Sequence, residues 1–206
     1  RRDFTVNAMA ICLNEGRFGE LVDPFDGLAD LEDGILRTPL DPDITFSDDP
    51  LRMLRCVRFS AQLKFLIDED TFEALTRNAG RMSIVSGERI ADELNKIMMT
   101  DSPSRGLMEL HRSTLMSRLL PEIVALDAVE TRCGKAHKNN FYHTLEVVDN
   151  ISRRGAGLWL RWAALLHDVG KPAALEATGC MYTHDRLGAD IARGILERLR
   201  YPSAVI

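Results

Sequence analysis

An acid and an arginine three positions apart could select a nucleotide base. Asp49 and Arg52 lie in the stretch SDDPLRMLRCVRF, and residues three apart share one face of a helix. An ionised aspartate only accepts hydrogen bonds, and an arginine only donates them. Cytosine and adenine present an amino donor beside a ring-nitrogen acceptor, whereas guanine and uracil present a carbonyl acceptor beside an N–H donor. The pair could therefore accept C and A and reject G and U, because mismatched buried polar groups are costly.

The same spacing is also typical of an ordinary helix start. An acid at a helix N-terminus is favoured by the helix dipole, and Asp49 could simply form an i,i+3 ion pair with Arg52. Arg55 and Arg58 continue the basic side of this helix, where a solvated face is the expected location and contact of one of them with a phosphate is the alternative. Spacing alone leaves the structural and the base-selecting interpretations open.

A second set of chemical groups lies in FYHTLEVVDN and WAALLHDVGKP. His143 is in the first stretch, and His167 and Asp168 are in the second. Neutral imidazole and carboxylate are good ligands for divalent metals. A single histidine is more often an ordinary core or surface residue, so the indication comes from the combination. Lys171, which follows the HD pair, could contact a phosphate.

The elements that carry these residues are predicted to be mostly helical from about residue 46 onwards. Ser47 or Asp48 can cap the first helix, with Pro50 in its first turn. Gly80 is expected to stop the second helix, and Gly170 and Pro172 to end the helix before them. Further helices are predicted at 69–78, from near 86, and at 101–111, 121–129, 141–153, 157–168 and 186–200.

Two tryptophans share one face of the predicted helix at 157–168. Trp159 and Trp162 lie on the same side as Leu166, and this spacing predicts core positions. Stacking on a nucleotide base is the alternative interpretation.

The first 40 residues have a different pattern. Short apolar runs, AMAICLN, GELVDP and ILRT, predict three short strands, and DGLADLEDG predicts a short acidic helix closed by Gly34. These elements are too few to bury a core by themselves. We therefore expect their partners in a portion that precedes Arg1.

Composition excludes several classes of protein. The chain has 206 residues and a formal net charge of −5, which argues against coating nucleic acid by bulk charge but allows a local basic groove. The sequence contains neither a secretory signal nor an apolar run of the roughly 18 residues that a membrane helix needs. The four cysteines form no CxxC pair, which favours reduced thiols and a cytoplasmic location.

Four stretches together resemble a known family. RRDFTVNAMA, LVDPFDGLADLEDGILRT, FSDDPLRMLRCVRFS and SGERIADEL are similar, in order and spacing, to the motifs of bacterial-type (class II) tRNA nucleotidyltransferases, the CCA-adding enzymes and related poly(A) polymerases. The resemblance implies a mainly α fold. It implies the remnant of a small α/β nucleotidyltransferase head at 1–40, a helical neck and body at 41–130, and part of a helical HD domain at 131–206. The polar stretch at 131–140, TRCGKAHKNN, is the best candidate for a linker.

The resemblance also implies roles for individual residues. Asp49 and Arg52 match the pair that reads C or A, and Asp48 stands where the family usually has a supporting glutamate. A second stretch is expected to brace the template helix: Glu88, Arg89, Glu93 and Leu94. The residues expected to bind the nucleotide are Arg1, Arg2, Asp3, Asp48, Asp49, Arg52 and Arg55.

The implied reaction is attack by the tRNA 3′ hydroxyl on the α-phosphate of CTP or ATP, with release of pyrophosphate. In the family, Mg²⁺ is held by a DxD motif that would precede the first residue here, so this chain alone is expected to lack transferase activity. Asp23, Asp26 and Asp30 are not expected to replace that motif. Poly(A) synthesis is the alternative reaction.

The second set of groups resembles the HD superfamily of metal-dependent phosphohydrolases. This resemblance implies a site for Mn²⁺, Ni²⁺ or Mg²⁺ at His143, His167, Asp168 and His184, with a closing aspartate expected beyond Ile206. Phosphohydrolysis could then be the main activity. A third interpretation is a non-catalytic body that binds tRNA.

Overall fold

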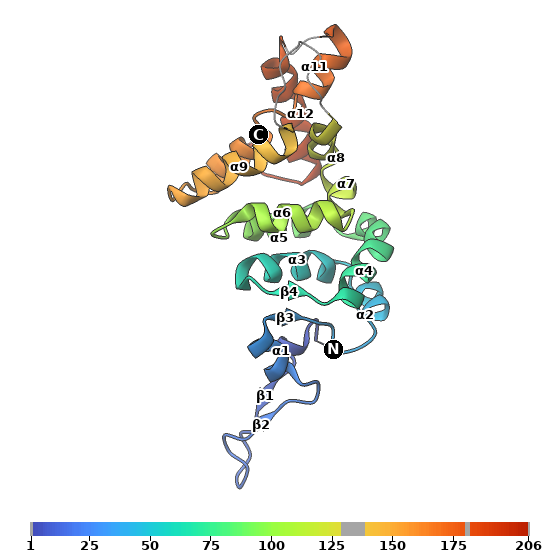
Figure 1. Ribbon diagram of the computed structural model, residues 1–206, viewed down its shortest axis with the longest axis vertical. Helices are drawn as coiled ribbons and strands as arrows, with labels where there is room; N and C mark the ends of the chain where they lie inside the picture. The colour runs from blue at the N-terminus through green and yellow to red at the C-terminus, as the bar shows by residue number, and fades with distance from the viewer. Residues whose placement is uncertain (1, 129–138, 180–181, 206) are drawn as a thin grey trace.

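The computed structural model describes residues 2–128, 139–179 and 182–205. Within these residues helices predominate and the strands are short (Figure 1), which confirms the mainly α fold class. Arg1 and most of the predicted linker at 131–140 lie outside the described residues.

The N-terminal segment contains the predicted short elements. A 3-10 turn, η1 (Thr5–Asn7), precedes β1 (Ala10–Ile11), which pairs antiparallel with β2 (Leu21–Val22). The helix α1 (Gly27–Asp33) ends at Gly34, whose left-handed φ of 68° permits the turn that the sequence predicted. β3 (Ile35–Leu36) pairs in parallel with β4 (Leu66–Ile67), so the segment is joined to the helical part.

The helical part begins earlier than predicted. α2 (Pro42–Asp48) is capped by Asp41, whose Oδ1 accepts the N–H groups of Asp43 and Ile44. α3 (Leu51–Leu63) follows, and Asp49 Oδ1 accepts the Leu51 N–H at 3.2 Å. The cap predicted at Ser47 or Asp48 is therefore wrong, because both residues belong to the last turn of α2. Aspartate followed by proline starts both helices.

The middle of the chain holds α4 (Glu69–Asn78), η2 (Ala79–Ile84), α5 (Gly87–Met98), α6 (Pro103–Arg112), α7 (Leu115–Leu119), α8 (Pro121–Val124) and η3 (Ala125–Ala128). α4 has the predicted bounds, but Gly80 lies inside η2 and does not end the helical path. α7 was not predicted. It follows Thr114, whose left-handed φ of 61° turns the chain without a glycine.

The C-terminal part consists of α9 (Asn140–Arg153), α10 (Leu158–Leu166), α11 (Lys171–Thr178) and α12 (His184–Arg198). The prediction that Gly170 and Pro172 end a helix is wrong, since α10 has already ended and both residues start α11. A proline in the first turn costs no hydrogen bond, because that N–H has no partner within the helix.

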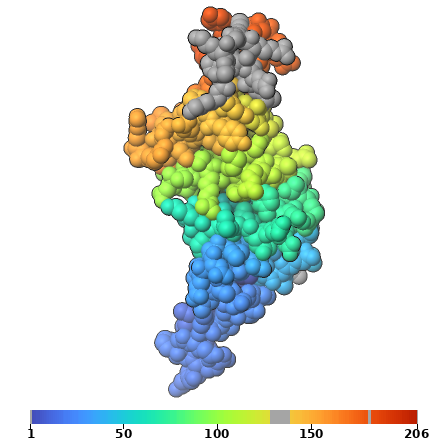
Figure 2. All heavy atoms as spheres, viewed as in Figure 1, coloured from blue at the N-terminus to red at the C-terminus, as the bar shows by residue number. Residues whose placement is uncertain are grey.

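These helices stack in layers along the longest axis of the molecule (Figures 1 and 2). α3 packs against α5 and α6, α6 against α9, and α9 against α10. One continuous core runs through the stack, from Phe4 to Leu199. Gly106 allows α6 to approach α5 closely, since a Cβ at position 106 would lie only 2.6 Å from Cγ2 of Ile97 in α5. Among the described residues, none of the helices is long and apolar enough to span a membrane.

Candidate functional sites

The start of α3 forms one wall of a pocket of about 260 Å³. The residues lining it come from the chain start, the junction of α2 and α3, α3 itself and α5: Arg2, Asp3, Asp49, Leu51, Arg52, Arg55 and Arg89. The structure thus brings together five of the seven predicted nucleotide ligands. Asp48 is exposed at the end of α2 and does not line this pocket, and Arg1 is outside the described residues.

Asp49 has both a capping contact and an ionic contact. Its Oδ1 accepts the Leu51 N–H, while Oδ2 lies 3.4 Å from Nη2 of Arg89. One oxygen of Asp49 therefore has the capping contact of the structural interpretation, but the ion partner is Arg89 rather than the Arg52 of that interpretation. Sequence analysis placed Arg89 only in the brace, whereas it also lines the pocket.

Arg52 forms a hydrogen bond with the backbone of α2. Its Nη1 donates to the carbonyl oxygen of Thr45 at 3.1 Å. This contact fixes the guanidinium at the pocket wall, one helical turn from Asp49. An acceptor and a donor thus border the same cavity.

Asp3 and Arg55 form a salt bridge. Arg55 Nη2 lies 2.6 Å from Asp3 Oδ2, and Asn7 Nδ2 donates to Asp3 Oδ1 at 3.1 Å. Burial alone would raise the pKa of Asp3, but the hydrogen bonds from Arg55 and Asn7 outweigh burial and hold the pKa below its usual value. The pair ties the chain start to α3 beside the pocket.

A buried ion pair braces α3 against α5. Arg58 Nε donates to Glu93 Oε2 at 2.7 Å, and the Arg58 guanidinium lies 4.0 Å from the centre of the Phe59 ring. The expected bracing contact from the SGERIADEL stretch is thus present through Glu93. The prediction of a solvated Arg58 is wrong, because this arginine and Glu93 are both buried.

The second group of side chains lies where α9 meets the end of α10. His143, His167 and Asp168 each offer one ligand atom, and these atoms all lie within 4.8 Å of one another. His184 Nε2 is 4.0 Å from Asp168 Oδ1. Two imidazoles and a carboxylate are a donor set that suits divalent transition metals.

Asp168 is the most constrained member of this group. Burial by itself raises its pKa, but hydrogen bonds from His167 and Lys171 outweigh burial and lower the pKa to about 2. Lys171 Nζ lies 2.6 Å from Asp168 Oδ2. The hydrogen bond to Asp168 raises the pKa of His167, whose Nδ1 lies 2.8 Å from the Ala164 carbonyl oxygen. A contact to that carbonyl orients the imidazole ring with Nε2 toward Asp168.

Two glycines let α12 reach this group. A Cβ on Gly170 would lie 2.0 Å from the His184 carbonyl oxygen and 2.8 Å from the Gly188 Cα. Only glycine at 170 fits so close a crossing. His184 is therefore positioned by backbone contact between the turn before α11 and the start of α12.

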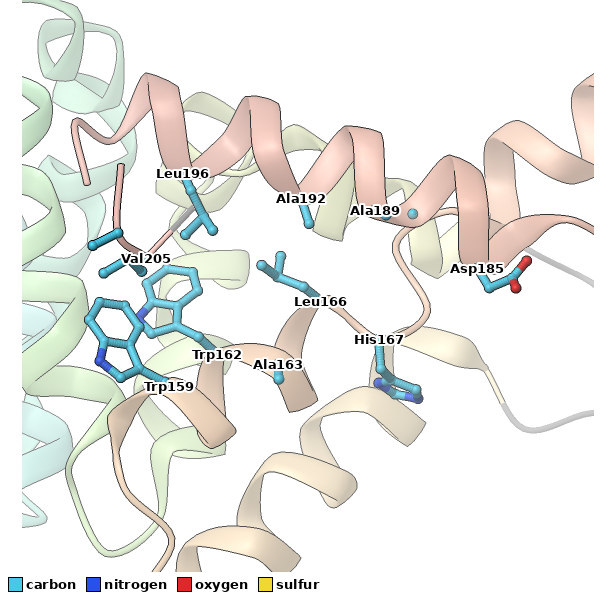
Figure 3. Close-up of a pocket in the computed structure, with 12 residues that line it drawn as sticks. Trp159, Trp162, Ala163, Leu166, His167, Asp185, Ala189, Ala192, Leu196 and Val205 are labelled. Atoms are coloured by element: carbon cyan, nitrogen blue, oxygen red, sulfur yellow. The ribbon is translucent and has the colours of Figure 1, made fainter. Parts of the chain in front are cut away.

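A groove between α10 and α12 begins at His167 (Figure 3). Its volume is about 570 Å³, and its walls are mostly apolar. Trp162 is buried, as predicted, but the core prediction is wrong for Trp159, which is 48% exposed and lines the groove. The shared helix face of the two tryptophans was the only signal of this groove in the sequence.

Three family models match successive parts of the chain. The model described as the poly A polymerase head domain matches residues 1–37. The model described as the probable RNA and SrmB-binding site of polymerase A matches residues 64–126, and the HD domain model matches residues 140–206. Nucleotidyltransferase and HD domains generally use divalent metals.

Curated relatives match nearly the whole of this chain. An A-adding tRNA nucleotidyltransferase of Deinococcus radiodurans is 38% identical over 99% of this chain and 48% of its own length. A multifunctional CCA protein of Laribacter hongkongensis is 40% identical over 98% of this chain and 49% of its own. The chain thus spans about half the length of these relatives.

Solved structures have the same fold. The CCA-adding enzyme of Bacillus stearothermophilus in complex with CTP has a TM-score of 0.62 at 26% identity, over 97% of this chain and 45% of that one. The Thermotoga maritima CCA-adding enzyme complexed with tRNA has a TM-score of 0.56 at 23% identity, over 97% and 60%, and shows the fold alone. The three matched models define the class of protein: a poly A polymerase head, an RNA-binding region and an HD domain follow one another along the chain. The chain belongs to the family of bacterial-type tRNA nucleotidyltransferases and poly(A) polymerases.

Proposed function

We propose that this chain is the base-selecting and RNA-binding part of a tRNA 3′-end nucleotidyltransferase, which adds C and A from CTP and ATP without a nucleic-acid template. The observation that carries the proposal is the position of Asp49 and Arg52 on the wall of one pocket, together with Arg2 and Arg55. The names of the relatives support the same reaction. A tRNA substrate implies a cytoplasmic location.

In this proposal each pocket residue has a defined task. Asp49 accepts from the amino group of cytosine or adenine, and Arg52 donates to the adjacent ring nitrogen. Arg89 keeps the Asp49 carboxylate oriented, and Arg2 and Arg55 counter the charge of the triphosphate, while Asp3 holds Arg55. Asp48 would act from outside this pocket, and Arg1 lies outside the described residues.

The reaction itself is attack by the tRNA 3′ hydroxyl on the α-phosphorus. The bond to the β-phosphate breaks, and pyrophosphate leaves. Mg²⁺, when bound, would neutralise the charge that develops on the phosphates. The residues of this chain supply base choice rather than ligands for that metal, so we propose that the chain by itself binds CTP and ATP but does not transfer them.

Substitution of Asp49 tests the proposal. Asp49→Ala should reduce the preference for CTP and ATP over GTP and UTP more than it weakens binding of triphosphates in general. The measurement is the dissociation constant of the 206-residue chain for each of the four nucleotides, determined by calorimetry.

Asp41→Ala is the matched control, because Asp41 caps α2 as Asp49 caps α3 but does not line the pocket. Loss of a cap costs about 0.5–2 kcal/mol of stability in either variant. Unchanged base preference in Asp49→Ala, or an equal change in Asp41→Ala, would remove the assignment.

The geometry of the histidine group favours a second candidate function, metal-dependent phosphohydrolysis. We propose that His143, His167, Asp168 and His184 hold Mn²⁺, Ni²⁺ or Mg²⁺, and that Lys171 contacts the phosphate of the substrate. A bound ion would supply an activated water and polarise the phosphoryl group. Loss of both Mn²⁺ binding and phosphatase activity in His167→Ala would support this function, and Mn²⁺ binding that survives the substitution would contradict it.

A choice between A-only and full CCA addition, or poly(A) synthesis, is testable on the same pocket. The relatives include both an A-adding enzyme and multifunctional CCA proteins. Comparable affinity for CTP and ATP supports CCA addition, whereas selective binding of ATP supports A-only addition or poly(A) synthesis. If only tRNA binds, with an affinity that falls steeply with salt, the chain is a non-catalytic RNA-binding body.

A further inference from the structure

The helix α5 is in contact with both halves of the helical stack. It packs against α3 and also contacts α10, and it lies in the layer between α3 and α9 (Figure 1). In its first turn, Arg89 Nη2 lies 3.4 Å from Asp49 Oδ2. This separation is long for a hydrogen bond, so a small shift of the start of α5 would remove the contact. The position of α5 therefore decides whether Arg89 reaches Asp49.

The residues that follow α12 form a turn with a fixed backbone conformation. Arg200 has a left-handed φ of 61°, and its N–H donates to the Glu197 carbonyl oxygen at 2.9 Å. The N–H of Tyr201 donates to the Leu196 carbonyl oxygen at 3.0 Å. These two hydrogen bonds form the Schellman pattern, in which glycine is the usual residue at the position of Arg200. We call residues 199–201 the α12 turn.

The end of α12 and the α12 turn pack directly on the start of α5. A Cβ on Gly87 would lie 2.6 Å from the carbonyl oxygen of Arg198 and 3.3 Å from the carbonyl carbon of Leu199. Only glycine at 87 permits so close an approach. About two helical turns further along α5, the side-chain oxygen of Asn95 accepts a hydrogen bond from the hydroxyl of Tyr201. The α12 turn is thus attached to α5 at two points.

We propose that the α12 turn is a positioning element for base selection: its packing on Gly87 fixes the start of α5 and so holds Arg89 beside Asp49. Gly87 and Arg89 lie in the same helical turn, so a displacement of one moves the other. The inference rests on the proposed base-selecting function of the pocket. It gives a role in the choice of base to residues that do not line the pocket.

Gly87→Ala is the direct test. The added methyl group must separate α5 from the end of α12, which should move Arg89 away from Asp49. The ratio of the dissociation constants for UTP and CTP, measured by calorimetry on the 206-residue chain, should fall about 2- to 30-fold, which is the usual range for substitutions of residues that connect two sites.

Gly106→Ala is the matched control. Its added Cβ would also lie 2.6 Å from the nearest atom, Cγ2 of Ile97, near the opposite end of α5. Ile97 is ten positions from Gly87, which corresponds to roughly 15 Å of helix. Gly106→Ala should lower the midpoint of thermal unfolding, as Gly87→Ala does, but leave the UTP/CTP ratio unchanged. A ratio that falls equally in both variants would show a general loosening of α5 and overturn the proposal.

A double variant separates positioning from a merely structural role. Arg89→Ala alone should lower the UTP/CTP ratio. Gly87→Ala in the Arg89→Ala background should lower the ratio no further, because the α12 turn acts through Arg89. Additive losses would mean that the two residues act independently, and they would contradict the proposal.

Tyr201→Phe serves as the test if circular dichroism shows that Gly87→Ala is unfolded. The phenylalanine ring keeps the packing against Trp159 and Trp162 but loses the hydroxyl contact with Asn95. The UTP/CTP ratio should fall in this variant, and only when Arg89 is present. In that case an unchanged ratio would overturn the proposal.

The outcomes also separate this proposal from the function on which it rests. If Asp49→Ala loses base preference while Gly87→Ala keeps it, the α12 turn has no part in base selection and the assignment of the pocket remains. If Gly87→Ala weakens binding of all four nucleotides equally, the positioning role is wrong. If Asp49→Ala keeps the base preference, the proposed function itself fails.

Discussion

Two of the buried carboxylates depend on arginines of α3. Asp3 pairs with Arg55, and Glu93 pairs with Arg58 and also accepts from Lys96. A buried charge without a partner is strongly destabilising. These residues therefore have a structural role beside the proposed nucleotide pocket, and their substitution should lower the free energy of unfolding even without a nucleotide.

Asp3 should make stability depend on pH in the acid range. Its pKa is below the usual value in the folded chain, so its contribution is fully present above the unfolded pKa of about 3.9 and is lost as the pH falls through the folded pKa. Asp3→Asn should flatten the decline of the free energy of unfolding below about pH 4, measured by urea denaturation at several pH values. Asp101→Asn removes an exposed carboxylate and should leave the decline as it is. An identical decline in Asp3→Asn would contradict the role given to Asp3.

Arg58 should be more important for stability than an exposed arginine. Arg58→Met leaves Glu93 buried with only Lys96 as an ionic partner, and breaking such a pair costs about 3–5 kcal/mol. The double variant Arg58→Met/Glu93→Leu should recover most of this loss, because no unpaired charge remains. Thermal and urea unfolding measure both effects, and a double variant that is less stable than Arg58→Met would show that the pair is not the cause.

At the scale of elements, close helix crossings place the chemical groups. Asp49 is positioned by the end of α2 and the start of α3, and His184 by the crossing of α12 over Gly170. Several helix boundaries predicted from the sequence were wrong at such crossings. An Asp-Pro or Gly-Pro combination can lie either at the start of one helix or just after the end of the preceding helix, so the combination alone does not locate the boundary. α11 shows this directly, since Gly170 and Pro172 begin it.

Gly170→Ala should displace the start of α12. The added Cβ would lie 2.0 Å from a backbone oxygen, so α12 must shift, and both the midpoint of thermal unfolding and the affinity for Mn²⁺ should fall. Gly194→Ala, in the same helix with nothing within 4 Å, should be neutral or stabilising by about 0.5–1 kcal/mol. Equal stability and equal Mn²⁺ affinity in the two variants would show that the crossing tolerates a side chain.

At the scale of the whole molecule, the two candidate sites lie in different layers of the stack. The pocket lined by Asp49 and Arg52 is at the start of α3, and the histidine group is where α9 and the end of α10 meet. α3 and α9 lie in separate layers (Figure 1). Substitutions in well-separated sites usually have additive effects. Damage to one site should therefore leave ligand binding at the other unchanged.

Metal binding should stabilise the C-terminal layers. A ligand at 100 times its dissociation constant contributes about 2.7 kcal/mol, so Mn²⁺ should raise the unfolding midpoint and a chelator should reverse the rise. His143→Ala should abolish the shift while leaving the CTP affinity intact. A shift of equal size in His143→Ala would place the metal elsewhere.

The sequence alone determined the class of fold, the helix α4 with its bounds, the glycine that ends α1, and the residues that could do chemistry. Each of these features depends on residues that are close to one another in the sequence. Contacts over long separations were decided by tertiary structure: Arg89 beside Asp49, Asp3 with Arg55, and His143 with His167. Whether a side chain on an amphipathic helix is buried depends on which other helix packs against it. Arg58 is therefore buried, while Trp159 is exposed. Periodicity gives the face of a helix, but only packing decides what lies against it.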